Sequence, residues 1–98
     1  MTYKVVFRRA AQREFADAAL WYEERRVGLG AEFTTEVALA IESIAQNPAR
    51  FPIMHRDVRC IRARRFPYSV FFRVESARIV VLAVFHARRN PRIWQGRA

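Results

Sequence analysis

Residues 68–86 read YSVFFRVESARIVVLAVFH, a stretch that predicts two strands joined by a tight turn. In residues 68–75 the alternate positions carry apolar side chains, namely Tyr68, Val70, Phe72 and Val74. This period of two is typical of a strand with one buried face. Residues 79–86 are almost wholly apolar, which predicts a central strand covered on at least part of both faces. Ser76-Ala77 is short enough to join the two strands tightly.

Two amphipathic helices are expected on the N-terminal side of these strands. The first begins near residue 10 and places apolar side chains at helical spacing: Phe15, Ala18, Ala19 and Tyr22. Gly28 and Gly30 are expected to end it. The second carries an apolar stripe formed by Phe33, Val37, Ala40, Ile41 and Ile44. Asn47-Pro48 stops this second helix, so the two helices and their glycine-containing turn predict a helical hairpin.

The remaining segments complete an α+β fold. Tyr3, Val5 and Phe7 alternate with polar residues and predict an N-terminal strand, and residues 58–65 alternate more weakly and predict another. A basic, polar tail is expected over residues 87–98. The element order is therefore βααβββ, and we expect a small antiparallel sheet with the helical hairpin packed across one face. A chain of 98 residues builds one hydrophobic core, so residues 1–98 are expected to form a single domain.

The positive charge is confined to the second half of the chain. Residues 47–98 contain twelve Arg against Asp57 and Glu75, a net charge of +10, whereas residues 1–46 contain six basic and seven acidic side chains, or −1. Such one-sided charge implies an acidic partner that docks on one region. Seventeen of the eighteen basic residues are Arg, whose planar guanidinium suits two-point contacts with carboxylate or phosphate.

The other reactive residue types do not point to a cofactor. Cys60 is the only cysteine, so no intrachain disulfide forms, and the expected role is that of a small buried side chain. His55 lies in a proline-flanked loop without neighbours at metal-ligand spacing, and we expect neither a metal nor a cofactor. No apolar run approaches membrane-spanning length. These features predict a cytoplasmic protein.

Several short motifs occur in order along nearly the whole chain. They are Ala19-Leu20-Trp21-Tyr22-Glu23, Gly28-Leu29-Gly30 followed by Phe33, the pairs Asn47-Pro48 and Phe51-Pro52, Arg65-Phe66-Pro67-Tyr68, and His86-Ala87-Arg88-Arg89-Asn90-Pro91 followed by Trp94. Each motif is weak alone, but together they resemble the ParE branch of the ParE/RelE toxin superfamily. The resemblance implies the toxin of a type II toxin–antitoxin pair. It also implies a ParD-like antitoxin whose acidic C-terminal segment is partly disordered and folds on binding.

The superfamily contains two mechanisms. ParE-like members are associated with inhibition of DNA gyrase. RelE-like members resemble ribosome-dependent endoribonucleases, in which basic side chains hold mRNA phosphates and a Tyr or His late in the chain helps the 2′-hydroxyl attack the neighbouring phosphate. The residues that would supply such a nuclease site are Arg59, Arg65, Arg73, His86 and Arg88. Ala87 stands where a catalytic aromatic occurs in some nuclease relatives, and the end of the chain has no Tyr. We therefore expect a gyrase inhibitor, with the ribonuclease as the alternative.

Two plainer interpretations belong beside these. His86 ends an apolar strand, where a hydrogen-bonded histidine is more common than an acid or base catalyst. A basic nucleic-acid-binding module without toxic activity is a third function class. It is disfavoured because the sequence contains no helix-turn-helix, OB or RRM signature.

The antitoxin is expected to cover the helical hairpin and the following strand. The predicted contact residues are Trp21, Tyr22, Arg59, Arg62, Arg64 and Arg65. Trp21 and Tyr22 point about 100° apart on a helix, so one is expected in the core and the other at a groove edge. The structural alternative for Arg62, Arg64 and Arg65 is the solvated face of an edge strand.

Recognition of the target is expected on the C-terminal tail. The predicted contact residues are Arg88, Arg89, Arg92 and Trp94. An exposed Trp within a basic segment is a common anchor for a protein or nucleic-acid surface. The alternative is that Trp94 folds back to cover the open edge of the core.

Overall fold

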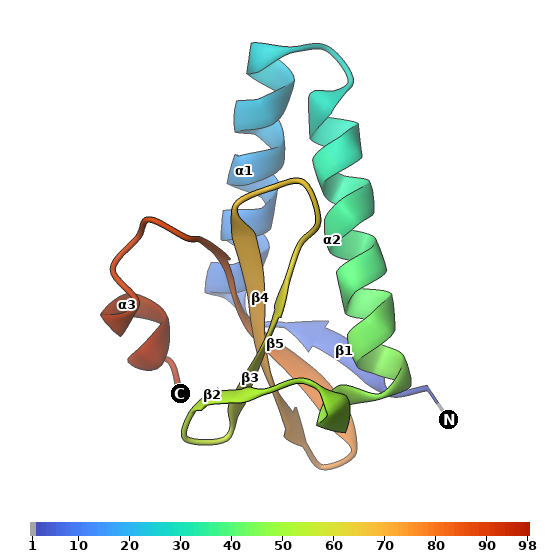
Figure 1. Cartoon of the computed structure of the whole chain (residues 1–98), viewed down its shortest axis with the longest axis vertical. Helices are drawn as coiled ribbons and strands as arrows, with labels where there is room; N and C mark the ends of the chain where they lie inside the picture. The colour runs from blue at the N-terminus through green and yellow to red at the C-terminus, as the bar shows by residue number, and fades with distance from the viewer. Residues whose placement is uncertain (1) are drawn as a thin grey trace.

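The computed structural model describes residues 2–98. Figure 1 shows the elements in chain order, and their bounds are β1 Lys4–Phe7, α1 Arg9–Arg25, α2 Leu29–Gln46, the short 3₁₀ helix η1 Pro48–Arg50, β2 Ile53–His55, β3 Val58–Arg62, β4 Tyr68–Glu75, β5 Arg78–His86 and α3 Arg92–Gln95. The predicted α+β class and the helical hairpin are confirmed. No helix among residues 2–98 combines the length and the apolar character that a membrane crossing requires.

The five strands form one sheet in the order β1-β5-β4-β3-β2. The pairs β2–β3, β3–β4 and β4–β5 are antiparallel, as expected. β1, however, pairs with β5 in the parallel direction, with Lys4 opposite Arg78 and Phe7 opposite Val81. Because about seventy residues separate these two strands in the chain, no turn signal between them could define their relative direction.

The sheet is covered on both faces, and β5 is buried throughout its length from Ile79 to Phe85, as the apolar run predicted. We call the residues between the sheet and the helical hairpin the inner cluster; its buried members include Phe33, Val37, Ile44, Val70, Phe72, Ile79, Val81 and Val84. The outer cluster, on the opposite face, consists of Val58, Phe71, Val80, Leu82, Ala83, Phe85 and Trp94. β5 therefore contributes to both clusters, although β4 is the middle strand of the five.

The helical hairpin depends on two glycines with different roles. Gly28 has a φ of +92°, a left-handed conformation that glycine adopts without strain, and it lies in the turn just before α2. Gly30 was expected to end the first helix, but it lies in the first turn of α2. A Cβ on Gly30 would stand 2.5 Å from the carbonyl oxygen of Ala19, so this glycine lets the two helices approach closely.

Three further expectations need correction. The strand predicted over residues 58–65 ends at Arg62, because Ala63 bonds back to the Tyr68 carbonyl and the chain turns toward β4. The short strand β2 was not predicted. The tail is not simply polar: it contains α3, which holds Trp94 against the outer cluster.

A bulge interrupts the pairing of β4 with β5. Phe71 lies opposite Ala83, but the next residue, Phe72, lies opposite Val81, so that β5 has one residue more than β4 at this point. Leu82 and Ala83 consequently both belong to the outer cluster. A bulge leaves backbone groups without ladder partners, and here side chains from other elements bond to the backbone of β5.

Candidate functional site

Glu14 of α1 lies at the centre of a group of charges beside this bulge. Its carboxylate accepts a hydrogen bond from the Val84 N–H at 3.1 Å. Arg97 donates to both carboxylate oxygens at 2.9 Å, and Arg89 donates to one of them at 2.6 Å. The Arg97 guanidinium also donates to the Leu82 carbonyl at 3.0 Å. One acidic side chain thus joins α1, the bulged strand and the C-terminal tail.

The charge state of Glu14 results from two opposed effects. Burial of the carboxyl raises its pKa, because the charged form loses water. The hydrogen bonds from Arg97 and Arg89, the charge of Arg97 and the Val84 N–H together outweigh burial, so the pKa lies below its ordinary value. Glu14 is therefore ionised at neutral pH and forms a stable counter-charge for both guanidinium groups.

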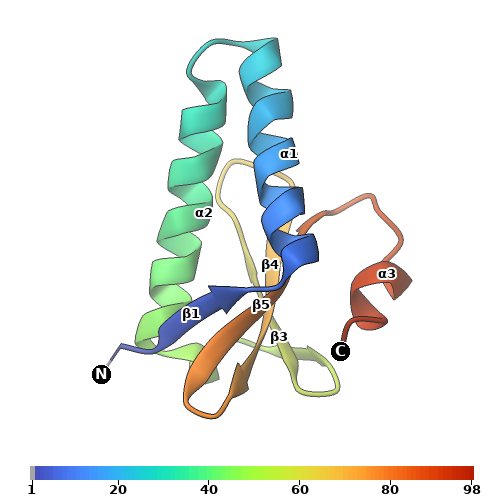
Figure 2. The same ribbon diagram turned by 180° about the vertical axis from the view of Figure 1, so that it is seen from behind.

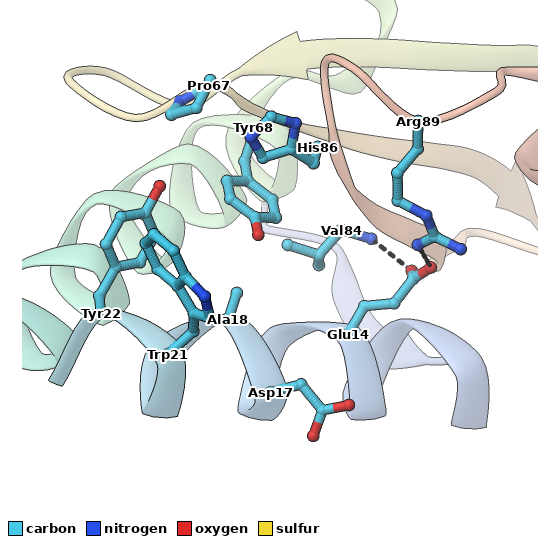
Figure 3. A pocket seen from close by; sticks show the side chains of 10 residues that line it. All are labelled: Glu14, Asp17, Ala18, Trp21, Tyr22, Pro67, Tyr68, Val84, His86 and Arg89. Carbon is cyan, nitrogen blue, oxygen red and sulfur yellow. Dashed lines mark hydrogen bonds and ion pairs between the residues drawn. The ribbon is translucent and has the colours of Figure 1, made fainter. Parts of the chain in front are cut away.

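Beside these charges lies an open pocket of about 560 Å³, which we call the α1 pocket. Figure 3 shows the rings of Trp21 and Tyr22 on one side of it and Glu14 and Arg89 on the other. Tyr68 and His86, at the facing ends of β4 and β5, also line the pocket. The combination of aromatic walls and a few polar groups is typical of a site that binds a ligand or a partner side chain.

The aromatic side of the α1 pocket is firmly packed. The ring centroid of Tyr22 is 4.9 Å from that of Phe66 and 5.2 Å from that of Phe33, so Tyr22 belongs partly to the core. Burial raises the pKa of Tyr22, whose hydroxyl is therefore neutral at physiological pH. Trp21 is 50% exposed and stacks under Arg25, whose guanidinium carbon is 3.7 Å from the ring centroid. The prediction of one core aromatic and one exposed aromatic is confirmed, with Trp21 as the exposed one.

A second, smaller groove of about 330 Å³ lies between α2 and β3. Arg62 and Arg64 line its β3 side, Glu36 and Glu42 line its α2 side, and Leu39 and Ile61 contribute apolar surface. β2 pairs with β3 at Val58 and Arg59, and the Cys60 N–H donates to the Pro52 carbonyl, so only the end of β3, at Ile61 and Arg62, has an open edge beside this groove. We call it the α2 groove; an extended acidic segment would find cations, apolar surface and free backbone groups there.

The other predicted antitoxin contacts are engaged within the chain. Arg59 donates to the carbonyl oxygens of Ala49 and Phe51, so its guanidinium holds the segment around η1. Arg65 donates to Glu32 of α2 at 2.5 Å, and this hydrogen bond lowers the pKa of the Glu32 carboxyl. The six predicted residues therefore do not form one patch: two lie at the α1 pocket, two at the α2 groove, and two are structural.

Two of the predicted nuclease residues, Arg59 and Arg73, are not brought together either. Arg59 lies opposite Phe72 of the inner cluster, whereas Arg73 lies opposite Val80 of the outer cluster. Since directly opposed residues of an antiparallel pair point to the same face, Arg59 and Arg73 point to opposite faces of the sheet. His86 is a strand-end histidine whose Nδ1 accepts a hydrogen bond from the Arg88 N–H at 3.0 Å.

The expectation of an exposed Trp94 is wrong. Its side chain is 4% exposed and stacks on Phe71, with the ring centroids 3.9 Å apart. The alternative, that the tail folds back over the core, is what the structure shows. The physical reason is that, without Trp94, the apolar side chains of Phe71 and its neighbours in the outer cluster would be exposed to water. Of the other predicted target contacts, Arg89 is held by Glu14, whereas Arg88 and Arg92 are exposed.

Glu14 and Arg97 were missed as site residues. Glu14 is 70 positions from its partner Val84 and 83 positions from its partner Arg97 in the chain. No local motif distinguishes Glu14 from the other acidic residues of α1. The one available signal is its place on α1, three residues after Ala11 and four before Ala18, both of which are buried in the inner cluster.

Comparison with known proteins gives one family. The sequence matches the family described as ParE toxin of type II toxin-antitoxin system, parDE, over residues 5–91. No individually curated protein sequence is significantly similar.

Two solved structures share the fold. The chromosomal ParDE toxin–antitoxin system from P. aeruginosa includes a chain with 18% identity and a TM-score of 0.73, covering 89% of this chain and 98% of that one. The toxin–antitoxin complex RelBE2 from Mycobacterium tuberculosis includes a chain with 21% identity and a TM-score of 0.59, covering 88% of this chain and 99% of that one. At these identities the likeness extends to the fold alone.

Proposed function

Because the chain belongs to the ParE toxin family of type II toxin–antitoxin systems, we propose that it inhibits growth by binding DNA gyrase and that a ParD-like antitoxin neutralises it. The family match over residues 5–91 carries the proposal. The separation of Arg59 from Arg73 supports a target-binding mechanism over RNA cleavage. Arg59 and Arg73 point to opposite faces of the sheet, and no single phosphate reaches both.

The antitoxin is proposed to bind at the two hollows beside the hairpin. Its acidic C-terminal segment would place carboxylates near Arg62 and Arg64 in the α2 groove, and an apolar side chain against Trp21 in the α1 pocket. A segment that orders on binding buries apolar surface, so the binding enthalpy should fall with temperature. The net charge of +9 on the whole chain favours rapid association with an acidic segment.

Gyrase is proposed to bind a different surface, which includes Arg88 and Arg92. Both side chains are exposed, and both lie on the tail that Glu14 and Trp94 hold in place. Arg89 and Trp94, which were also predicted as target contacts, would then act by positioning this tail. The proposal assigns the two partners to separate sets of exposed arginines.

A reciprocal experiment tests this assignment. Two double variants, Arg62→Ala/Arg64→Ala and Arg88→Ala/Arg92→Ala, remove the same charge from the α2 groove and from the tail. Calorimetry with the antitoxin should show at least tenfold weaker binding for the first variant and little change for the second. Inhibition of gyrase supercoiling should show the reverse pattern. Equal losses in both assays for both variants would contradict separate surfaces.

A second experiment tests the mechanism itself. His86→Ala should retain growth inhibition, because the ring accepts a backbone hydrogen bond and has no carboxylate partner among residues 2–98. Induced cells should show a DNA-damage response and stalled replication before translation falls. Cleavage of ribosome-bound message within minutes of induction, lost in His86→Ala, would establish the ribonuclease alternative instead.

A further inference from the structure

The β4–β5 turn lies at the end of the molecule opposite the α1–α2 turn (Figures 1 and 2). Near the β4–β5 turn, the outer face of the sheet carries a band of charges. Its members come from the strands β1, β4 and β5, from the connection between β1 and α1, and from the β2–β3 turn: Lys4, Arg8, Arg56, Asp57, Arg73, Glu75 and Arg78. Five cations and two carboxylates give the band a net charge of 5 − 2 = +3. None of these residues lies at the α1 pocket or the α2 groove.

The band is continuous from one side of the sheet to the other. Lys4 of β1 lies opposite Arg78 of β5, and Arg78 lies opposite Glu75 of β4. One oxygen of the Glu75 carboxylate is 3.6 Å from a nitrogen of Arg73 and 3.7 Å from a nitrogen of Arg8. Arg73 continues the band to Asp57 at 3.5 Å, and Arg56 is the neighbour of Asp57 in the β2–β3 turn.

The register places the band on the outer face. Arg73 lies opposite Val80, a member of the outer cluster, so both point away from the helical hairpin. In β1, Val6 packs on the outer cluster, and side chains two residues apart in a strand share a face, so Lys4 also points outward. The three adjacent strands β1, β5 and β4, at about 4.8 Å spacing, make the band about 10 Å wide, and the β2–β3 turn extends it further.

The two carboxylates organise the band without neutralising it. Each approaches the guanidinium groups at 3.5 to 3.7 Å, longer than a strong charge-assisted hydrogen bond, and Glu75 is shared between Arg8 and Arg73. Lys4, Arg56 and Arg78 are exposed and form no ion pair with any carboxylate in the described part of the chain. The band therefore presents two neighbouring unpaired cations, Lys4 and Arg78, on one side of two ion-paired guanidinium groups, and a third unpaired cation, Arg56, on the other.

We propose that this outer-face basic band binds the phosphodiester backbone of duplex DNA. A row of Arg and Lys side chains matches the charge of a phosphate backbone. Among residues 2–98 the one exposed aromatic side chain is Trp21, which lines the α1 pocket, so an unpaired base would find no exposed ring to stack on at the band, and this favours a duplex over a single strand. Its contacts are to phosphates alone, so binding is independent of base sequence. This inference goes beyond the proposed gyrase target and is measured without gyrase.

Fluorescence anisotropy of the purified chain with a labelled 20-base-pair duplex tests the proposal. At 50 mM salt the wild type should bind, and three phosphate contacts predict a slope of log K against log salt of about −2.7. Lys4→Gln/Arg78→Gln removes two free cations, so the slope should become shallower, at about −0.9. The affinity for the duplex should decrease at least tenfold. Arg62→Gln/Arg64→Gln, which removes the same charge from the α2 groove, should bind nearly as the wild type does.

Each other outcome overturns the proposal. Equal losses in the two variants would mean that only total charge matters, and absence of binding by the wild type at 50 mM salt would mean that the band is solvated surface. Tighter binding of a 20-nucleotide single-stranded RNA, with the same dependence on Lys4 and Arg78, would assign the band to RNA. If Lys4→Gln/Arg78→Gln does not fold by circular dichroism, Arg56→Gln/Arg78→Gln gives the same comparison from the β2–β3 turn.

Discussion

Arg97, the penultimate residue of the chain, holds both oxygens of the Glu14 carboxylate at 2.9 Å. The side chain of Arg97 is 21% exposed and that of Glu14 is 13% exposed, so this contact is largely shielded from water. It fixes the end of the tail to the middle of α1, and Trp94 is thereby kept on the outer cluster. The tail is part of the fold, and its stability depends on a few named contacts.

Removal of the central carboxylate should destabilise the protein. Glu14→Gln leaves Arg89 and Arg97 beside an amide that accepts fewer hydrogen bonds and carries no charge, so we expect a loss of about 2 kcal/mol in unfolding free energy. Urea denaturation measures the loss. Glu24→Gln makes the same change on an exposed part of α1 and should cost less than about 0.5 kcal/mol. Equal effects would show that the contact adds nothing to stability.

The same contact predicts a dependence on pH. The folded-state pKa of Glu14 lies below its ordinary value of 4.5, so the folded chain binds this proton less readily than the unfolded chain. The stabilisation is therefore fully present above pH 4.5 and is lost as the pH falls through the lower, folded value. Between pH 7 and pH 3.5 the wild type should lose more unfolding free energy than Glu14→Gln. Parallel losses in the two proteins would contradict this assignment.

The two tryptophans offer a matched comparison. Trp94 is 4% exposed and stacks on Phe71, so Trp94→Ala should cost about 3 kcal/mol or more and should expose the outer cluster. Trp21 is 50% exposed, so Trp21→Ala should cost less than about 1 kcal/mol. Acrylamide quenching of the remaining tryptophan in each variant reports on its burial. Strong quenching of Trp94 in Trp21→Ala would show that the tail is detached in solution.

The glycines predict a further difference in stability. Gly30→Ala places a methyl group 2.5 Å from the Ala19 carbonyl oxygen, so α1 and α2 must move apart, at a cost of about 2 kcal/mol. Gly96→Ala meets its nearest atom, the Arg92 carbonyl oxygen, at 3.4 Å and should be nearly neutral. Thermal unfolding compares the two variants. A melting temperature of Gly30→Ala equal to that of the wild type would mean that α1 and α2 accommodate the added methyl group without loss of packing.

Much of the fold could be predicted from local patterns. The apolar run of β5 and the alternation in β4 depend on residues near one another in the chain, and so do the helical stripes of α1 and α2. Periodicity is a local property, and it decides which elements form and which faces they bury. The adjacent residues Trp21 and Tyr22 were likewise separable from helix geometry alone.

The relationships between distant segments were decided by the tertiary structure. The parallel direction of β1 beside β5, the bulge at Leu82 and Ala83, and the burial of Trp94 all depend on surfaces that exist only once the sheet has formed. The candidate site shows the same limit, since Glu14 meets Arg89 and Arg97 only when α1 and the tail pack on the same strand. Sequence alone determined the two long helices, the strands β1, β4 and β5, and the sign of the charge, because these are properties of neighbouring residues. Packing decided which charges meet, because a contact across 83 residues leaves no local pattern.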